Sequence, residues 1–377
     1  MRVLILSCNT GEGHNAAGKA VLERVIAEGH EAVMEDIMMM AGKRTSRIVG
    51  GTYVGIVQHM PHFFQLLYKA GSRISSPARK SPVYWANTFM AKHLSRYLEE
   101  NHFDIIVTPH LFPAETMTYM KKHNMLKQKV VAIATDYTCI PFWEETNCDY
   151  YILPHPDLVE EYAEKGIPRE KLIPFGIPVG LAFSEKKEKP QAKTDCGLPV
   201  SEPAYLVMSG SMGFGKVNLF AAELCHHCRQ GEQIVIICGH NESMKKVLER
   251  QFQGNSNVHI IGFTNQISDY MDACDVVFTK PGGLSSTEAA VKRIPIVHTA
   301  PIPGCETKNL QFFTSRGLSV AARRISDQVE AGNRLINDPD GFLAMTEAQK
   351  KEICSDSSKK IFLFLETLKD EETSCAG

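Results

Sequence analysis

The chain has 377 residues, of which 44% are hydrophobic and 22% charged, and its net charge at pH 7 is −2. A chain of this length is usually too long to fold around a single hydrophobic core, so we expect two domains. The composition is that of a folded globular protein, and the near-zero charge argues against a general nucleic-acid binder. Because no run of 18 apolar residues occurs, we predict neither a transmembrane helix nor a signal peptide.

The eleven cysteines are an odd number and are scattered, as is typical of free thiols in a reducing cytoplasm. The one tight cluster is CHHC at residues 225–228, inside a predicted helix over 218–229. Zinc needs four ligands, and only one more cysteine and one more histidine lie nearby in the sequence. We therefore interpret the cluster as one face of a helix and predict no metal site.

Short apolar runs alternate with helical stretches in the first half of the chain. Their apolar residues are continuous rather than alternating, which predicts a parallel sheet covered on both faces. In chain order, we expect strands at 2–7, 31–36, 103–110, 130–136 and 150–155, and helices at 15–28 and near 113–123.

A second set of strands follows a charged, proline-bearing stretch at 181–200, which we interpret as a solvated linker. The expected strands begin near residues 204, 233, 258, 275, 294 and 318, and a final helix is expected over 345–370. The sequence thus predicts an α/β protein with two Rossmann-like, doubly wound domains that face a central cleft. The predicted boundaries are 1–180, 181–200, 201–345 and 346–377.

Three glycine-rich turns each join a predicted strand to a predicted helix, at residues 7–20, 209–216 and 279–290. The free N–H groups of a helix N-terminus favour an anion such as a phosphate. In the third turn, Gly282 and Gly283 allow close backbone approach, and Glu288 is placed to accept hydrogen bonds from a ribose diol. The hydroxyls of Ser285, Ser286 and Thr287 add donors, so this turn predicts a nucleotide-sugar site.

An NAD site is the rival interpretation of the first turn. Gly11, Gly13 and Ala16 formally satisfy the dinucleotide fingerprint, with an acidic residue at 35 or 36 ending the next strand. However, His14 would stand where the pyrophosphate packs, and nothing else in the sequence suggests hydride transfer.

Five segments of the sequence stand out: GEGHNAAG, ATDYT with the following FW, FGIPV, TKPGGLSSTEA and PIPGCETKN. Together they resemble family 28 glycosyltransferases, and most closely the monogalactosyldiacylglycerol synthases and processive diacylglycerol glucosyltransferases. The resemblance implies the two-domain GT-B fold and transfer of a hexose from a UDP-sugar to diacylglycerol or a glycosyl-diacylglycerol. Transfer of N-acetylglucosamine to another lipid or polyprenyl carrier, and a UDP-sugar epimerase on the same fold, remain alternatives.

The resemblance also implies roles for individual residues. His14 matches the favoured general base, and a neutral imidazole suits that role because it can accept a proton near pH 7. Asp136, which follows a predicted strand, either orients His14 or acts as the base itself. The positions that match the family's donor-binding residues are Gly11, Glu12, Gly13, Ser211, Phe263, Gly282, Gly283, Leu284, Ser285, Ser286, Thr287, Glu288, Glu306 and Asn309.

No carboxylate pair of the DxD type stands beside the predicted donor site. We therefore expect UDP to be stabilised by helix N-termini and hydroxyls, with no metal and no cofactor, the UDP-sugar being a co-substrate. Cys305 stands where plant galactolipid synthases carry glutamine, which leaves glucose, galactose and N-acetylglucosamine open as the donor sugar.

Residues 37–98 contain nine lysines and arginines and no acidic residue, with many aromatic residues between them. Such a segment in a nearly neutral protein is typical of docking on an anionic membrane surface. No RNA-binding motif accompanies the charge. We predict a cytoplasmic protein, peripheral on the inner face of the cell membrane. The predicted docking residues are Phe63, Phe64, Arg73, Arg79, Lys80 and Trp85.

Overall fold

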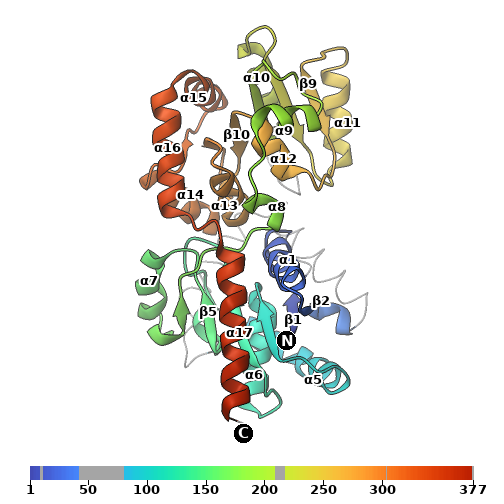
Figure 1. Ribbon diagram of the computed structural model, residues 1–377, viewed down its shortest axis with the longest axis vertical. Coiled ribbons are helices and arrows are strands. Elements are labelled where there is room, and N and C mark those ends of the chain that lie inside the picture. The colour runs from blue at the N-terminus through green and yellow to red at the C-terminus, as the bar shows by residue number, and fades with distance from the viewer. Residues whose placement is uncertain (9–11, 42–79, 209–216, 303, 376–377) are drawn as a thin grey trace. The chain divides into compact units, whose positions relative to one another are not determined.

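The computed structural model describes residues 1–8, 12–41, 80–208, 217–302 and 304–375. The chain divides into two compact units (Figure 1). The first comprises Met1–Leu181, Pro303–Cys305 and Asp356–Gly377, and the second comprises Ala182–Ile302 and Glu306–Ser355. Each unit contains a parallel sheet with helices, which confirms the predicted α/β class.

The sheet of the first unit has the strand order β2-β1-β3-β4-β5-β6, and every pairing in it is parallel. All residues of β3 are buried, as the continuous apolar run predicted. The strand order reverses between β1 and β3, and ligands bind beside such a reversal in open α/β sheets. The strands are β1 Arg2–Ser7, β2 Glu31–Asp36, β3 Ile105–Thr108, β4 Lys129–Ile133, β5 Tyr150–Ile152 and β6 Leu172–Ile173.

Two helices from opposite ends of the chain contribute to one hydrophobic core in the first unit. Val21 and Val25 of α1 pack with Ile361 and Leu365 of α17 and with the apolar residues of β1, β3, β4 and β5. Within the described residues, the helices of this unit are α1 Glu12–Ala27, α4 Pro82–Asn87, α5 Ala91–Glu100, α6 Leu111–Lys122, α7 Val159–Glu164 and α17 Ser357–Cys375.

The second sheet has the order β12-β11-β10-β7-β8-β9 and is also parallel throughout. Its order reverses between β10 and β7, and all six strands expected from the sequence are present. The strands are β7 Ala204–Met208, β8 Gln233–Ile237, β9 Val258–Ile261, β10 Val276–Thr279, β11 Ile296–His298 and β12 Val320–Ala321.

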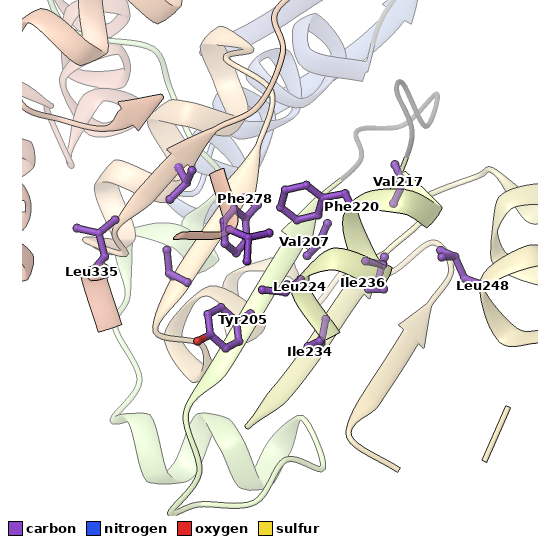
Figure 2. Packing of buried hydrophobic residues seen from close by; sticks show 14 of the residues in the cluster. Tyr205, Val207, Val217, Phe220, Leu224, Ile234, Ile236, Leu248, Phe278 and Leu335 are labelled. Atoms are coloured by element: carbon purple, nitrogen blue, oxygen red, sulfur yellow. The ribbon is translucent and has the colours of Figure 1, made fainter. Parts of the chain in front are cut away.

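Phe278 of β10 lies at the centre of the second core (Figure 2). Its ring lies 5.0 Å from that of Phe220, edge to face, and stacks at 6.3 Å on Tyr205. The helices of this unit include α10 Val217–His227, α11 Glu242–Gln251, α12 Ile267–Ala273, α13 Gly283–Lys292, α14 Cys305–Ser315, α15 Ile325–Asn337 and α16 Pro339–Glu352.

Residues 182–200 are more ordered than a solvated linker. They contain α9 (Lys189–Asp195), preceded by α8 (Leu181–Ser184), and α9 packs against α12. Ala192 and Leu198 are buried, and the Lys187 ammonium pairs with Asp195 and Asp269. Because these side chains have partners in the second unit, the segment is part of that unit.

The helix expected over 345–370 is two helices in the structure. α16 ends at Glu352, Ile353 takes an extended conformation, and α17 begins at Ser357. The Ser357 hydroxyl donates to the Gly176 carbonyl at 2.7 Å, within the first unit. The break therefore returns the end of the chain to the first unit, where α17 packs (Figure 1).

Gly332 of α15 offers a test of the second core. A Cβ atom at this position would lie 2.2 Å from Cζ of Phe278, which is fully buried. We expect Gly332→Ala to lower the free energy of unfolding by about 1–3 kcal/mol, although alanine is the better helix former. Urea denaturation measures this change. With Phe278→Leu as second substitution, the loss should be smaller than the sum of the two single losses, and a fully stable Gly332→Ala variant would contradict the packing.

Candidate active site

Three residues that follow neighbouring strands meet at the carboxyl edge of the first sheet. His14 lies in the first turn of α1, after β1, and His110 follows β3. Thr135 follows β4. The His14 Nδ1 atom lies 2.8 Å from the Thr135 hydroxyl oxygen, and its ring meets that of His110 edge to face at 4.8 Å. His14, the predicted base, therefore lies beside the point between β1 and β3 at which the strand order reverses.

His110 has a fixed place in this group. Its Nδ1 atom accepts the backbone N–H of Phe112 at 3.1 Å, which caps α6. A nitrogen that accepts a hydrogen bond is unprotonated, so the ring is held in its neutral form. Burial, together with the neighbouring His14, holds the pKa of His110 well below its ordinary value.

The environment of His14 favours its neutral form. Burial is the largest effect and lowers the pKa of His14 below 6.5. The negative charge of Asp136 and a hydrogen bond with the Pro109 backbone act in the opposite direction and offset part of that effect. A histidine with a lowered pKa is unprotonated at neutral pH and can accept a proton.

Thr135 and Asp136 both act on the His14 ring. The Thr135 hydroxyl contacts the imidazole directly, and the charge of Asp136 favours its protonated form. The prediction that Asp136 orients His14 stays a prediction.

The second group of predicted residues surrounds the N-terminus of α13. β10 leads through Lys280 and Pro281 to Gly282, the residue that precedes the helix, and among the described residues no side chain caps this end. The backbone N–H groups of the first turn favour an anion, as the sequence predicted.

Two of the three hydroxyls expected to face a ligand have protein partners instead. The Ser286 hydroxyl lies 2.9 Å from Nε2 of His298, and the Thr287 hydroxyl donates to the Gly283 carbonyl at 2.7 Å. Both residues are buried, because this side of α13 faces the sheet, whereas Ser285 is partly exposed. The Ser286 and Thr287 hydroxyls thus already contact protein groups, and a ligand could use only their remaining hydrogen-bonding capacity.

Glu288 is the most unusual residue of this group. It is only 9% exposed, and among the residues that the structure describes its carboxyl group has no hydrogen-bond or ion-pair partner. Burial raises the pKa of Glu288 to about 8. Since a buried carboxylate without a partner is unfavourable, this arrangement points to a ligand that supplies hydrogen-bond donors.

Glu306 and Asn309 lie on α14 and are both buried. The two carboxylate oxygens of Glu306 already have partners: one accepts from Nζ of Lys280 at 2.7 Å, and the other from the backbone N–H of Ile302 at 2.7 Å. A donor hydroxyl bound by Glu306, one of the positions that match the family's donor-binding residues, would have to use the remaining acceptor capacity of this carboxylate.

Phe263, after β9, is 59% exposed. Its ring stacks on that of His240, which follows β8, with centroids 4.2 Å apart and planes 15° apart. The pair lies at the carboxyl edge of the second sheet, the edge at which ligands of this architecture bind.

Other predicted residues fall outside the two groups. Glu12 and Gly13 begin α1 and are exposed. Lys80 differs from the prediction, because its ammonium group donates to the Glu145 carbonyl at 2.5 Å and is turned toward the protein. Trp85 is exposed, as predicted. The predicted residues Gly11, Phe63, Phe64, Arg73, Arg79 and Ser211 lie outside the described residues.

The sequence interpretation missed His110, Thr135, Lys280 and His240. All four come within three residues of the end of a strand, and this position was the available signal. Their side-chain types are common in turns, so the sequence alone did not single them out.

Two family models match the sequence. The model described as monogalactosyldiacylglycerol (MGDG) synthase matches residues 14–179, and that of the glycosyltransferase family 28 C-terminal domain matches residues 204–351. Two relatives named processive diacylglycerol beta-glucosyltransferase come from Staphylococcus carnosus and Bacillus cereus. They are 24% and 26% identical over 350 and 354 residues, which cover 92% and 93% of this chain and 87% and 89% of theirs.

Solved structures of other proteins share the fold. MurG of Acinetobacter baumannii has a TM-score of 0.59 and 13% identity, over 97% of this chain and 99% of its own. The UDP-GlcNAc 2-epimerase of Neisseria meningitidis bound to UDP-GlcNAc has a TM-score of 0.61 and 15% identity, over 97% and 100%. At such identities the likeness shows the fold, which is GT-B.

The titration of His14 tests the first group. We expect its imidazole to titrate below pH 6.5 in the folded protein, as followed by NMR. Asp136→Asn removes a charge that favours the protonated ring, so it should lower this pKa further. Glu31→Gln, which neutralises an exposed carboxylate at the opposite edge of the sheet, is the control and should change nothing. A rise of the pKa in Asp136→Asn would contradict the assignment.

Proposed function

We propose that this chain, which belongs to glycosyltransferase family 28, transfers a hexose from a UDP-sugar to diacylglycerol or a glycosyl-diacylglycerol. The observation that carries the proposal is Glu288, a buried carboxyl group with no partner among the described residues, one turn into a helix with an uncapped N-terminus. The MGDG synthase match over residues 14–179 and the names of the relatives support the lipid acceptor.

The second unit holds the donor in this proposal. The first-turn N–H groups of α13 bind the diphosphate, and the Glu288 carboxylate accepts hydrogen bonds from the ribose diol. The same N–H groups stabilise the negative charge that develops on UDP as it leaves. The proposed reaction uses no cofactor, and the UDP-sugar is a co-substrate.

The first unit supplies the base. The acceptor hydroxyl oxygen forms a bond to C1 of the sugar, the bond from C1 to the diphosphate oxygen breaks, and UDP leaves with the electron pair. The hydroxyl proton passes to His14, whose lowered pKa keeps it ready to accept. Asp136 remains the alternative base.

The fold does not separate transferases from epimerases, because the epimerase of Neisseria meningitidis shares it. The acceptor side separates them, since an epimerase needs no lipid-binding segment. The acid-free, aromatic-rich stretch 37–98 and the MGDG synthase match both favour a lipid acceptor. N-acetylglucosamine transfer to another lipid carrier is the remaining alternative, and a comparison of UDP-sugars in one assay distinguishes it.

We also propose that the first unit docks on an anionic membrane surface. Trp85 and Phe89, four residues apart, are 59% and 66% exposed. Lys92 and Arg96 follow on α5, are exposed, and have no acidic partner among the described residues. Apolar rings beside free cations suit the interface of an anionic bilayer. No helix in the described part of the chain has an apolar stretch long enough to cross a bilayer.

Glu288→Gln should have opposite effects on ligand binding and on stability. It should weaken UDP binding by about 1.5–3 kcal/mol, the usual loss for a hydrogen bond to a charged group, as measured by calorimetry. Because the folded-state pKa of about 8 lies above the unfolded value, the wild type loses stability as pH rises from about 4.5 to 8. The unliganded variant should therefore be more stable than the wild type at pH 8. Unchanged UDP affinity would contradict the donor assignment.

His14→Ala should reduce turnover about 10²–10⁴-fold and leave UDP affinity nearly unchanged, because a general base acts in the chemical step. The assay follows labelled hexose from UDP-sugars into diacylglycerol. If the variant keeps a near-normal rate while Asp136→Asn is inactive, the base is Asp136. Absence of lipid product with every UDP-hexose in the wild type would overturn the proposed function.

Vesicles that contain phosphatidylglycerol should bind the protein more tightly than neutral vesicles, and salt should weaken this binding, since charges are screened beyond about 10 Å at 0.1 M salt. Replacing Lys92 and Arg96 with serine should weaken binding by at most about 1 kcal/mol per residue. The matched control replaces Lys246 and Arg250, an exposed pair with the same spacing on α11. Equal losses in both variants would contradict docking through the first unit.

A further inference from the structure

A fully buried histidine lies behind the proposed donor site. His298 is the last residue of β11 and has no exposed surface. Its Nε2 atom lies 2.9 Å from the Ser286 hydroxyl oxygen, and its Nδ1 atom lies 2.9 Å from that of Ser319. Both ring nitrogens are therefore used, and neither the family resemblance nor the proposed chemistry gives this residue a role.

The position of His298 connects the parts of the second unit that carry the donor residues. Its backbone pairs with that of Thr279, the last residue of β10 before the turn into α13. Ser286 belongs to α13 and lies two positions before Glu288. The His298 ring also meets Phe313 of α14 edge to face, at 5.5 Å, on the helix that carries Glu306 and Asn309.

We infer that His298 is a positioning residue for the donor site, which fixes the first turns of α13 through Ser286 and thereby the place of Glu288. The inference rests on the proposed function. Within the described part of the chain, no side-chain cap holds the N-terminus of α13. The hydrogen bond between Ser286, on the side of α13, and His298 of β11 holds this end of the helix in place instead.

A neutral imidazole suits this place between two hydroxyls. It offers one N–H donor and one acceptor, and a serine hydroxyl can serve as either, so both serines are satisfied with no charge in the core. Burial lowers the pKa of His298 to about 3, which keeps the ring neutral throughout the physiological range. An apolar ring of similar size would fill the space but leave both hydroxyls without their partner.

The test separates positioning from stability in the full-length chain. It measures UDP affinity by calorimetry and unfolding by urea for His298→Phe, Ser286→Ala and the double variant. His298→Phe should weaken UDP binding about tenfold and lower stability. In the double variant the unsatisfied Ser286 hydroxyl is gone, so part of the stability should return, while UDP binding should stay as weak as in His298→Phe.

The matched control is Tyr205→Phe. The Tyr205 hydroxyl is buried and bonds Glu232 and Asn333, at 3.2 and 2.8 Å, near the beginning of β7 and thus away from the donor edge. This variant should lose stability and keep wild-type UDP affinity.

Three results would overturn the inference, and they are distinguishable. Wild-type UDP affinity in folded His298→Phe, or in Ser286→Ala if His298→Phe does not fold, overturns the positioning role alone. A wild-type chain that does not bind UDP overturns the proposed function and this inference with it. Recovery of UDP affinity together with stability in the double variant would also overturn it, because His298 would then act only on stability.

Discussion

Parallel pairing of the strands is the constraint on which both groups of site residues depend. In a parallel sheet all strands run in one direction, so the residues that follow them gather at one edge. This rule brings His14 and Thr135 into hydrogen-bond contact across 121 positions of sequence. In the second unit it places His298 beside the strand that leads into α13.

Burial then decides the protonation of the groups gathered there. It lowers the pKa of His14 and His298 and raises that of Glu288, so each shift favours the uncharged form. The consequences differ with the partners. His298 has two hydroxyls and is satisfied within the protein. Glu288 has no such partner among the described residues, and its unfavourable burial is compensated only when a donor group arrives. The protein with an empty donor site is therefore less stable, and the hydrogen-bond donors of a bound ligand compensate for that loss.

The sequence predicted the fold class, every strand of the second sheet and the first helix, although that helix begins at Glu12 and not at residue 15. These features depend on apolar runs and on turn-forming residues, both of which can be recognised from residues adjacent in the sequence. It did not predict that Ser286 and Thr287 turn inward, because the direction of a side chain on α13 depends on which face packs against the sheet. The roles of Thr135 and His110 depend on strand order, a property of the whole unit. Lys80 was misjudged for a similar reason, since its partner Glu145 lies 65 positions away.

The return of α17 to the first unit has a consequence for synthesis on the ribosome. The apolar face of α17, with Ile361, Phe362, Leu365 and Leu368, completes the core formed by β1, β3, β4 and β5. Chains are made from the N-terminus at about 5–20 residues per second, and domains generally fold as units. The first unit to begin is therefore the last to be finished. Residues 182–355 leave the ribosome with every strand of their own sheet before α17 emerges, while the first sheet has the cover of α1 but not yet that of α17.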